Sequence, residues 1–331
     1  MRCFAIAQAW ARRGGKSVFF LSESLPALAQ RILSAGFEIV PLSASTAEGD
    51  VQSLLEFRRK YARSWVVLDG YAFTAQHQQL LLDAGFRVMV VDDYGQTDSY
   101  PADIVLNQNI YAAAEGYEKT YRGRAPNTRL LLGSDYALLR AEFLPWSRWT
   151  RSINSNASRL LITLGGSDAA NRSLDVLRAL SSFAEFEIVL LVGGTAQADS
   201  ALETEAARII NKVKIVLNTS DMPGWMAWAD IAIAGAGVTS YELCFMGLPS
   251  LLMVLADNQR PIANRLAEMG VAMEYCPHGT FEAAALASVL QNLAHSKQRG
   301  KMSQSARQLV DGLGADRGCA AMLDYASTES V

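Results

Sequence analysis

One segment, from Ala229 to Asn264, limits the folds open to this chain more than any other. It reads ADIAIAGAGVTSYELCFMGLPSLLMVLADNQRPIAN. The apolar run at 231–234 is typical of a strand buried in a parallel sheet. The glycines of Gly235-Ala236-Gly237 permit a tight turn in which no Cβ atom blocks an approaching ligand. A helix and a second apolar strand, Leu251–Leu255, follow, so the segment predicts a strand–turn–helix–strand unit of an α/β fold.

The start of the predicted helix has the features of an anion site. Thr239 or Ser240 is placed to cap the helix, whose first turn carries free N–H groups and a positive dipole. A phosphate or diphosphate is the natural ligand of such a position. Glu242 lies within the first turn, where its carboxylate would repel phosphates, so we expect it to bind the hydroxyls of a sugar diol.

Polar residues also end the second strand of this segment. Asp257, Asn258 and Gln259 follow it directly, and parallel strands end at the edge where open α/β sheets bind ligands. A Gly-x-Gly turn by itself more often serves packing than nucleotide binding. Here the turn, Glu242 and the second polar cluster occur together, and this combination favours a nucleotide-sugar site.

The composition is that of a globular enzyme. The chain has 331 residues, 50% hydrophobic and 19% charged, with a formal net charge of −3. This length favours two domains, and the charge gives no electrostatic footprint for nucleic acid. No apolar run approaches the roughly 20 residues of a membrane span, and Arg12 and Arg13 interrupt any signal-peptide pattern. We therefore expect no nucleic-acid partner and no stable membrane insertion.

The four cysteines are scattered without paired spacing, at Cys3, Cys244, Cys276 and Cys319. Their pattern implies neither a disulfide framework nor a zinc site, which fits a reducing compartment. The expectation is a cytoplasmic monomer without metal or cofactor.

The first half of the chain alternates helices with strands that end in polar residues. Strands are predicted at Trp65–Leu68, before Asp69-Gly70-Tyr71, and at Arg87–Val91, before Asp92-Asp93-Tyr94. This alternation implies a parallel sheet with right-handed crossovers. The half begins on a helix, at residues 1–13, whereas a doubly wound domain begins on a strand. The first strand of this domain is therefore expected to be missing.

A polar stretch without periodicity divides the chain. We predict an N-terminal Rossmann-like domain at 1–145, a linker at 146–158, and a nucleotide-binding domain at 159–312. A last helix within 313–331 is expected to cross back to the first domain. The predicted fold class is α/β, with two doubly wound domains facing a cleft.

Several stretches of the chain together resemble a known family. They are MRCFAIAQAW, VVLDGY, VVDDY, DIVLNQNIYA, LLGSDYALLRAEF, LLITLGGSDAAN and the segment described above. They look like the hydrolase of pseudaminic (nonulosonic) acid biosynthesis that acts on UDP-2,4-diacetamido-2,4,6-trideoxy-β-L-altropyranose. The second half is also similar to the glycosyltransferase that adds N-acetylglucosamine to lipid-linked muramoyl-pentapeptide. This resemblance implies the two-domain GT-B fold, with UDP held by the second domain.

The resemblance implies roles for individual residues. It assigns catalysis to Tyr71 and Asn258, UDP binding to Gly165, Gly166, Gly237, Thr239, Ser240 and Glu242, and sugar binding to Arg2, Tyr94 and Gln259. Three of these residues have a plainer alternative. Tyr71 and Tyr94 are equally typical of loop aromatics that cover the edge of a core, and Gln259 is placed to cap the helix after it.

The chain departs from the family at its first residues. In the family a Gly-x-Gly-His loop, whose histidine lies in the active site, precedes a segment like Met1–Cys3. That histidine is absent here, and the chain has only His77, His278 and His295, each expected on the surface. A start assigned too late is one explanation, and true loss of the loop is the other.

The leading hypothesis is metal-independent hydrolysis of a UDP-activated diacetamido-trideoxy sugar to UDP and the free sugar. A general base would activate water against the anomeric carbon, and helix-end N–H groups would stabilise the leaving UDP. The alternatives are a UDP-sugar glycosyltransferase and a non-catalytic UDP-sugar-binding remnant.

The absent histidine predicts hydrolysis near the uncatalysed background for the 331-residue chain. UDP release from the UDP-sugar measures this. Turnover comparable to that of an N-terminally extended version containing the histidine would contradict the prediction.

Overall fold

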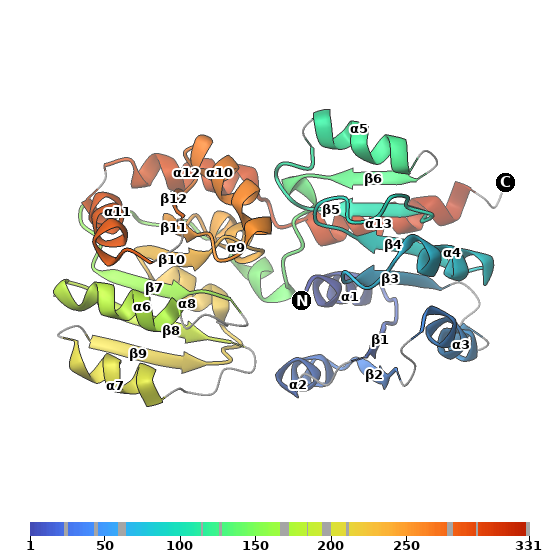
Figure 1. The fold of residues 1–331 in the computed structure, drawn as a ribbon, viewed down its shortest axis with the longest axis horizontal. Helices are drawn as coiled ribbons and strands as arrows, with labels where there is room; N and C mark the ends of the chain where they lie inside the picture. Colours follow the sequence, from blue (N-terminus) through green and yellow to red (C-terminus); the bar gives the residue numbers. More distant parts are fainter. Residues whose placement is uncertain are drawn as a thin grey trace. The chain divides into compact units, whose positions relative to one another are not determined.

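The computed structural model divides the chain into two compact units (Figure 1). The first comprises Met1–Ala141 and Gly312–Val331, and the second comprises Glu142–Asp311. The structure describes residues 1–331 except 23–25, 43–45, 59–63, 114, 126–127, 166–171, 184, 194–199, 210–211, 277–280, 296 and 329–331. In this division the stretch predicted as a linker is counted within the second unit.

The first unit is built from parallel strands and covering helices. Its strands are β1 (Val18–Leu21), β2 (Glu38–Pro41), β3 (Trp65–Asp69), β4 (Arg87–Val91), β5 (Ile104–Asn107) and β6 (Arg129–Leu132). Its helices are α1 (Arg2–Arg12), α2 (Pro26–Ser34), α3 (Ala47–Arg58), α4 (Ala75–Asp83), α5 (Glu115–Arg124), the short η1 (Ser134–Tyr136) and α13 (Gly314–Thr328). The strands form a two-stranded sheet, β1-β2, and a four-stranded sheet, β3-β4-β5-β6. Among the described residues no strand pairs with both β1 and β3, so the two sheets are not continuous.

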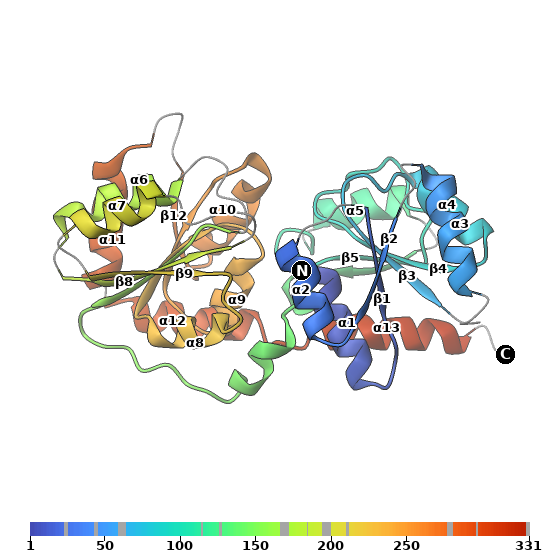
Figure 2. The same ribbon diagram turned by 90° about the horizontal axis from the view of Figure 1, so that it is seen from below.

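The four-stranded sheet is covered on both faces, as parallel sheets usually are. Helices α1 and α13 lie on one face, and α4 and α5 lie on the other (Figure 2). Alternate residues of β4 follow this division, because Met89 and Val91 join the core under α1 and α13 while Val88 and Val90 join the opposite core. The near-continuous apolar run of the strand therefore reflects burial on both sides.

The last helix, α13, packs within the first unit. A carboxylate oxygen of Asp316 lies 2.7 Å from Arg12 Nη2, and the other oxygen of Asp316 accepts from Arg13. Gly314 allows the close approach that starts this helix, since a Cβ there would lie 2.3 Å from the carbonyl oxygen of Ala137. The C-terminal residues thus complete a core begun at the N-terminus.

The second unit contains one six-stranded parallel sheet. Its strands are β7 (Arg159–Thr163), β8 (Glu187–Val192), β9 (Lys212–Leu217), β10 (Ile231–Gly235), β11 (Ser250–Met253) and β12 (Met273–Tyr275). Its helices are α6 (Arg172–Ala179), α7 (Ser200–Arg208), α8 (Met222–Trp228), α9 (Thr239–Phe245), α10 (Arg260–Glu268), α11 (Ala283–His295) and α12 (Arg299–Leu309), with the short η2 (Ala141–Trp146) at the unit boundary, η3 (Leu180–Ser182) and η4 (Asp257–Gln259). The helices α6, α7 and α11 cover one face of the sheet, and α8, α9 and α12 cover the other (Figure 2).

The strand order of this sheet is β12-β11-β10-β7-β8-β9. Read from β9, it is the 3-2-1-4-5-6 order of a doubly wound fold. Successive strands are added toward one edge of the sheet from β7 to β9 and toward the other edge from β10 to β12. The predicted strand–turn–helix–strand segment is therefore confirmed as β10, α9 and β11. It lies at the topological switch point, where such sheets bind ligands.

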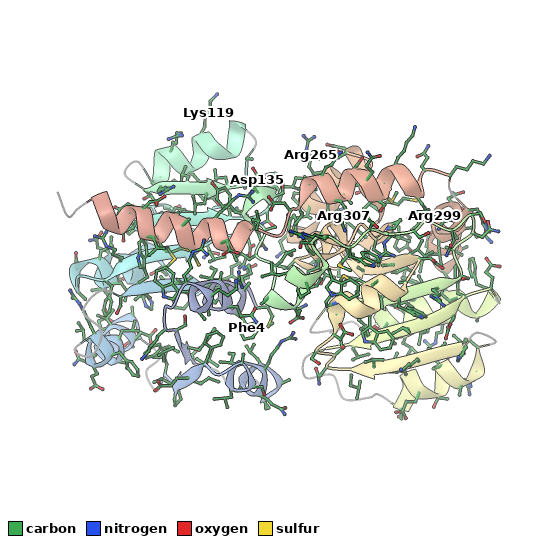
Figure 3. All side chains as sticks on the ribbon, turned by 180° about the vertical axis from the view of Figure 1, so that it is seen from behind. Phe4, Lys119, Asp135, Arg265, Arg299 and Arg307 are labelled. Atoms are coloured by element: carbon green, nitrogen blue, oxygen red, sulfur yellow. The ribbon has the colours of Figure 1, made fainter. Side chains whose placement is uncertain are left out.

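Two arginines of α12 hold the segment before β7 onto the second unit (Figure 3). Arg299 Nη2 donates to the carbonyl oxygens of Asn154 and Ser155 at 2.9 and 2.8 Å. Arg307 Nη2 donates to the carbonyl oxygen of Ser147 at 3.1 Å. These bonds explain why a polar, aperiodic stretch lies along this unit.

The expectation that every histidine lies on the surface is wrong for His77. This residue is only 6% exposed, because α4 packs against α3 and brings His77 Nε2 to 3.8 Å from Asp50 Oδ2. Its ring also packs edge-on against Phe73. Burial lowers the pKa of His77 and raises that of Asp50. His295 is exposed, and His278 lies outside the described residues.

A buried carboxylate fastens the loop after β4. Asp92 is fully buried and accepts hydrogen bonds from the Tyr121 hydroxyl and from the backbone N–H of Gly95, the latter at 2.7 Å. The Tyr121 hydroxyl also accepts from Asn107 Nδ2 at 2.8 Å. Burial and the neighbouring Asp92 raise the pKa of Tyr121.

Replacing Tyr121 by phenylalanine is therefore expected to lower the free energy of unfolding by about 1–3 kcal/mol, because a buried carboxylate loses a donor. Urea denaturation measures this, with Tyr136→Phe as the control of the same chemistry. Since the folded state holds Tyr121 protonated, wild-type stability should also fall as pH rises above about 10, the unfolded pKa of tyrosine. Equal losses in the two variants would contradict the assignment.

Candidate functional site

The switch point of the second unit brings two loops into direct contact. Thr163 at the end of β7 pairs with Ala234 near the end of β10, so both strands end at the same level. A Cβ atom at Gly235 would lie 3.1 Å from the carbonyl oxygen of Leu164, which explains the glycine there. Gly165 has φ +104°, a conformation that L-residues rarely adopt. The structure thus places Gly165 beside the Gly-Ala-Gly turn, whereas Gly166 lies outside the described residues.

A third loop, following β11, covers the same turn. The amide oxygen of Gln259 accepts from the backbone N–H of Leu255 at 3.0 Å. Gln259 Nε2 lies 3.8 Å from the position a Cβ would take at Gly237. Gln259 occupies the N-cap position of α10, but its side chain makes no cap hydrogen bond, so the capping alternative is wrong. Its side chain instead fixes the loop after β11 against the turn after β10.

The predicted cap of α9 is also wrong. The N-cap residue is Val238, and no side chain caps the helix. Because Val238 already has helical φ and ψ of −55° and −32°, Thr239 and Ser240 lie inside the first turn. The backbone N–H of Ser240 bonds to the Gly237 carbonyl at 3.0 Å. The Ser240 hydroxyl, however, is buried and has no hydrogen-bond partner among the described residues.

Among the described residues, that hydroxyl is a buried side-chain group left without a hydrogen bond. Ser240 is only 1% exposed, and a buried polar group without a partner carries a desolvation cost of about 1–3 kcal/mol. Such a cost is typical of a site that a ligand completes.

The remaining predicted residues of this loop region differ in exposure. Glu242 is 6% exposed on the first turn of α9, where the helix dipole stabilises a carboxylate. Asn258 is exposed on η4, and Thr239 is half-buried. The structure brings Gly165, Gly237, Ser240 and Gln259 together, and the roles predicted for Glu242, Thr239 and Asn258 stay predictions.

The first unit has a second polar cluster, at the carboxyl ends of β3 and β4. Arg2 Nη2 lies 2.6 Å from Asp69 Oδ1, and Arg2 Nη1 donates to Asp93 Oδ1. Burial alone would lower the pKa of Arg2, but the charges and hydrogen bonds of the two aspartates outweigh it and raise that pKa. Arg2 is thus a permanent cation that ties two strand ends together.

Both predicted tyrosines of this unit are at the same edge. The Tyr71 hydroxyl donates to Asp93 Oδ2 at 3.0 Å. The rings of Tyr71 and Tyr94 lie 5.8 Å apart, and the two side chains are 59% and 46% exposed. The sugar-site roles of the two tyrosines and the alternative that they cover the edge of the core both stay predictions. The sequence patterns assigned no role to Asp69, the first residue after its predicted strand, or to Asp93, the second residue after its predicted strand.

Across the described residues, no group of three or more His, Cys, Asp or Glu side chains is arranged to hold a metal ion. In the same part of the chain, no helix is both long and apolar enough to cross a membrane.

Comparison with known proteins relates the chain to glycosyltransferases. Residues 160–313 match the Glycosyltransferase family 28 C-terminal domain. The chain is 28% identical over 210 residues to the spore coat polysaccharide biosynthesis protein SpsG of Bacillus subtilis, covering 61% of this chain and 60% of SpsG. It is 34% identical over 117 residues to the UDP-N-acetylglucosamine--N-acetylmuramyl-(pentapeptide) pyrophosphoryl-undecaprenol N-acetylglucosamine transferase of Ectopseudomonas mendocina, covering 34% of this chain and 30% of the transferase. The aligned part therefore spans less than two thirds of each relative's length.

A solved structure extends the likeness over nearly the whole chain. The crystal structure of MurG from Acinetobacter baumannii superimposes with a TM-score of 0.67, covering 98% of this chain and 95% of that chain at 14% identity. At this identity the match shows the fold alone. The fold is of the GT-B type, as predicted, and the match to a glycosyltransferase domain is limited to residues 160–313.

Proposed function

We propose that this protein is a UDP-sugar-dependent glycosyltransferase whose second unit binds the nucleotide. The observation that carries the proposal is the buried hydroxyl of Ser240 at the switch point, which has no hydrogen-bond partner among the described residues and lies three positions after the glycine turn. The glycosyltransferase domain match over residues 160–313 supports the same assignment, because it includes this turn.

The proposed diphosphate site uses backbone groups and one hydroxyl. Gly165 and Gly237 lack side chains, so phosphate oxygens can approach their backbone N–H groups closely. The Ser240 hydroxyl would donate to a phosphate oxygen and so gain the partner it lacks. We assign Thr239 to the same group of phosphate contacts.

Other residues are assigned to the rest of the nucleotide sugar. Glu242 is proposed to bind the ribose hydroxyls, since its carboxylate accepts hydrogen bonds but repels phosphate. Asn258 and Gln259, on the loop after β11, are proposed to contact the sugar end of the diphosphate. In the first unit, Arg2, Tyr71 and Tyr94 are proposed to contact the sugar.

The proposed reaction breaks the bond between the anomeric carbon and the β-phosphate oxygen. The electron pair of this bond leaves with UDP, and hydrogen bonds from the phosphate site stabilise the developing charge. A new bond forms between the anomeric carbon and the acceptor oxygen, whose proton passes to a base. Transfer and hydrolysis differ only in whether that oxygen belongs to an acceptor molecule or to water.

Hydrolysis of a UDP-activated diacetamido-trideoxy sugar is the second candidate. It is favoured by the stretches of sequence that resemble the hydrolase of pseudaminic acid biosynthesis, several of which lie in the first unit. The exposed Tyr71, bonded to Asp93, is placed at a strand end where a water molecule has access.

Product analysis separates the candidates. We expect the protein to release UDP from UDP-N-acetylglucosamine or a diacetamido UDP-sugar faster when a hydroxyl acceptor is added, with the sugar recovered on the acceptor. Chromatography of the nucleotide and mass spectrometry of the sugar measure both. Free sugar at a rate indifferent to acceptors would favour hydrolysis, and UDP binding without turnover would contradict both reactions.

A substitution at Ser240 tests the nucleotide site directly. Ser240→Ala should weaken UDP binding by about 5- to 30-fold, because one hydrogen-bond donor to phosphate is lost. The free energy of unfolding should stay within about 1 kcal/mol of wild type or rise, because the variant removes a buried hydroxyl that has no partner among the described residues. Calorimetric titration with UDP and urea denaturation measure the two quantities.

Ser303→Ala is the matched control. Ser303, on α12, is also buried. It lies near the C-terminal end of α9, because its hydroxyl oxygen would be 2.8 Å from a Cβ atom added at Gly247. UDP affinity should be unchanged in this variant. An unaltered affinity in Ser240→Ala, or equal losses in both variants, would contradict the proposed phosphate contact.

A further inference from the structure

One residue of the first unit, Asp93, is held in place by donors from several elements. Its backbone carbonyl accepts from Asn107 Nδ2, Asn109 Nδ2 and the Tyr111 hydroxyl at 2.7, 3.0 and 2.7 Å. These side chains lie at and after the end of β5, whereas Asp93 follows β4. The main chain of Asp93 is therefore fixed independently of its carboxylate.

The carboxylate of Asp93 divides its two oxygens between different partners. Oδ1 accepts from Arg2 Nη1 and from Asn109 Nδ2, the latter at 3.3 Å. Oδ2 accepts from the Tyr71 hydroxyl at 3.0 Å. Because Arg2 also binds Asp69, the guanidinium cannot turn away without breaking a second ion pair. The Asp93 side chain thus has one orientation.

This arrangement sets the direction of the hydrogen bond from Tyr71. A carboxylate paired with a guanidinium has no hydrogen to give, so the hydrogen between Tyr71 and Asp93 belongs to the tyrosine. The Tyr71 side chain is largely exposed at the strand edge, and its hydroxyl hydrogen is committed to Asp93. Toward a ligand, the Tyr71 oxygen can only accept.

We infer that Asp93 is a positioning residue that makes Tyr71 a hydrogen-bond acceptor, so that the site selects a ligand group bearing an O–H or N–H hydrogen at this point. The inference rests on the proposed function for the identity of the ligand, a nucleotide sugar. It adds a specificity rule: a sugar hydroxyl or amide N–H is bound at Tyr71, and an analogue with fluorine or an ether oxygen there is rejected.

The variant Asp93→Asn reverses this polarity. Arg2 offers only donors, so the amide oxygen of the asparagine must face Arg2, and its Nδ2 then faces Tyr71. That N–H donates to the Tyr71 oxygen and releases the phenolic hydrogen toward the ligand. Asp98→Asn is the matched control, because Asp98 is an exposed aspartate in the same β4–β5 connection.

The first measurement needs no ligand. In protein labelled with ¹³C at tyrosine Cζ, the Tyr71 resonance is assigned by its loss in Tyr71→Phe. It should shift in Asp93→Asn and stay in place in Asp98→Asn. If the chemical shift of the Tyr71 resonance does not change in Asp93→Asn, the inference is overturned and the proposed function is unaffected.

The second measurement reads specificity. Affinities are compared for UDP, UDP-glucose and its 2-, 3-, 4- and 6-deoxyfluoro analogues. Wild-type protein and Asp98→Asn should prefer hydroxyl over fluorine by about tenfold at one position, the value of one lost hydrogen bond. Asp93→Asn should reduce that preference to within about threefold while binding UDP unchanged. A merely structural role would weaken all sugars alike and leave the preference intact.

The outcomes are separable. No discrimination at any position in wild type, or the same discrimination in Asp93→Asn, would overturn the inference. Failure to bind UDP and every UDP-sugar would instead overturn the proposed function together with the specificity rule derived from it.

Discussion

The pairing of β7 with β10 is the constraint on which the candidate site depends. These parallel strands are neighbours in space but are separated in sequence by β8 and β9. After β9 the chain returns to the middle of the sheet, and later strands are added toward the other edge. Their helices leave on opposite faces, and the loops at their carboxyl ends meet without a helix above them. Gly165 and the turn at Gly235–Gly237 occupy this position, and Gly235 permits the contact between the two loops. Any ligand of the turn therefore meets backbone from both strands at once.

The first unit uses a different principle at its strand ends. Its polar edge is organised by charge rather than by glycine, because Arg2 joins Asp69 and Asp93 across two strands. The partially buried guanidinium fixes both carboxylates, and Asp93 in turn fixes Tyr71. The half-exposed rings of Tyr71 and Tyr94 thus lie beside side chains that ion pairs and hydrogen bonds hold in place.

The sequence predicted the elements with a strong hydrophobic pattern and missed those without one. β10, α9 and β11 were recognised because apolar strands flank a glycine turn. β12 has three residues, too few to show a period, and α5, EGYEKTYRGR, is almost wholly polar. The role of Asp93 was out of reach because its ion pair joins residues 91 positions apart. The prediction that Thr239 or Ser240 caps α9 was wrong, because the backbone angles of Val238 already place the start of the helix before them.

The switch-point loops of the second unit are proposed to bind the nucleotide diphosphate, and the other nucleotide-sugar assignments depend on this. Backbone amide NMR during titration with UDP tests it most directly. We expect the amide signals of Gly165, Gly237 and Ser240 to shift together and to saturate with one dissociation constant. Saturating shifts confined to the opposite edge of the sheet, around Asp230 and Arg299, or no shifts at all, would contradict it.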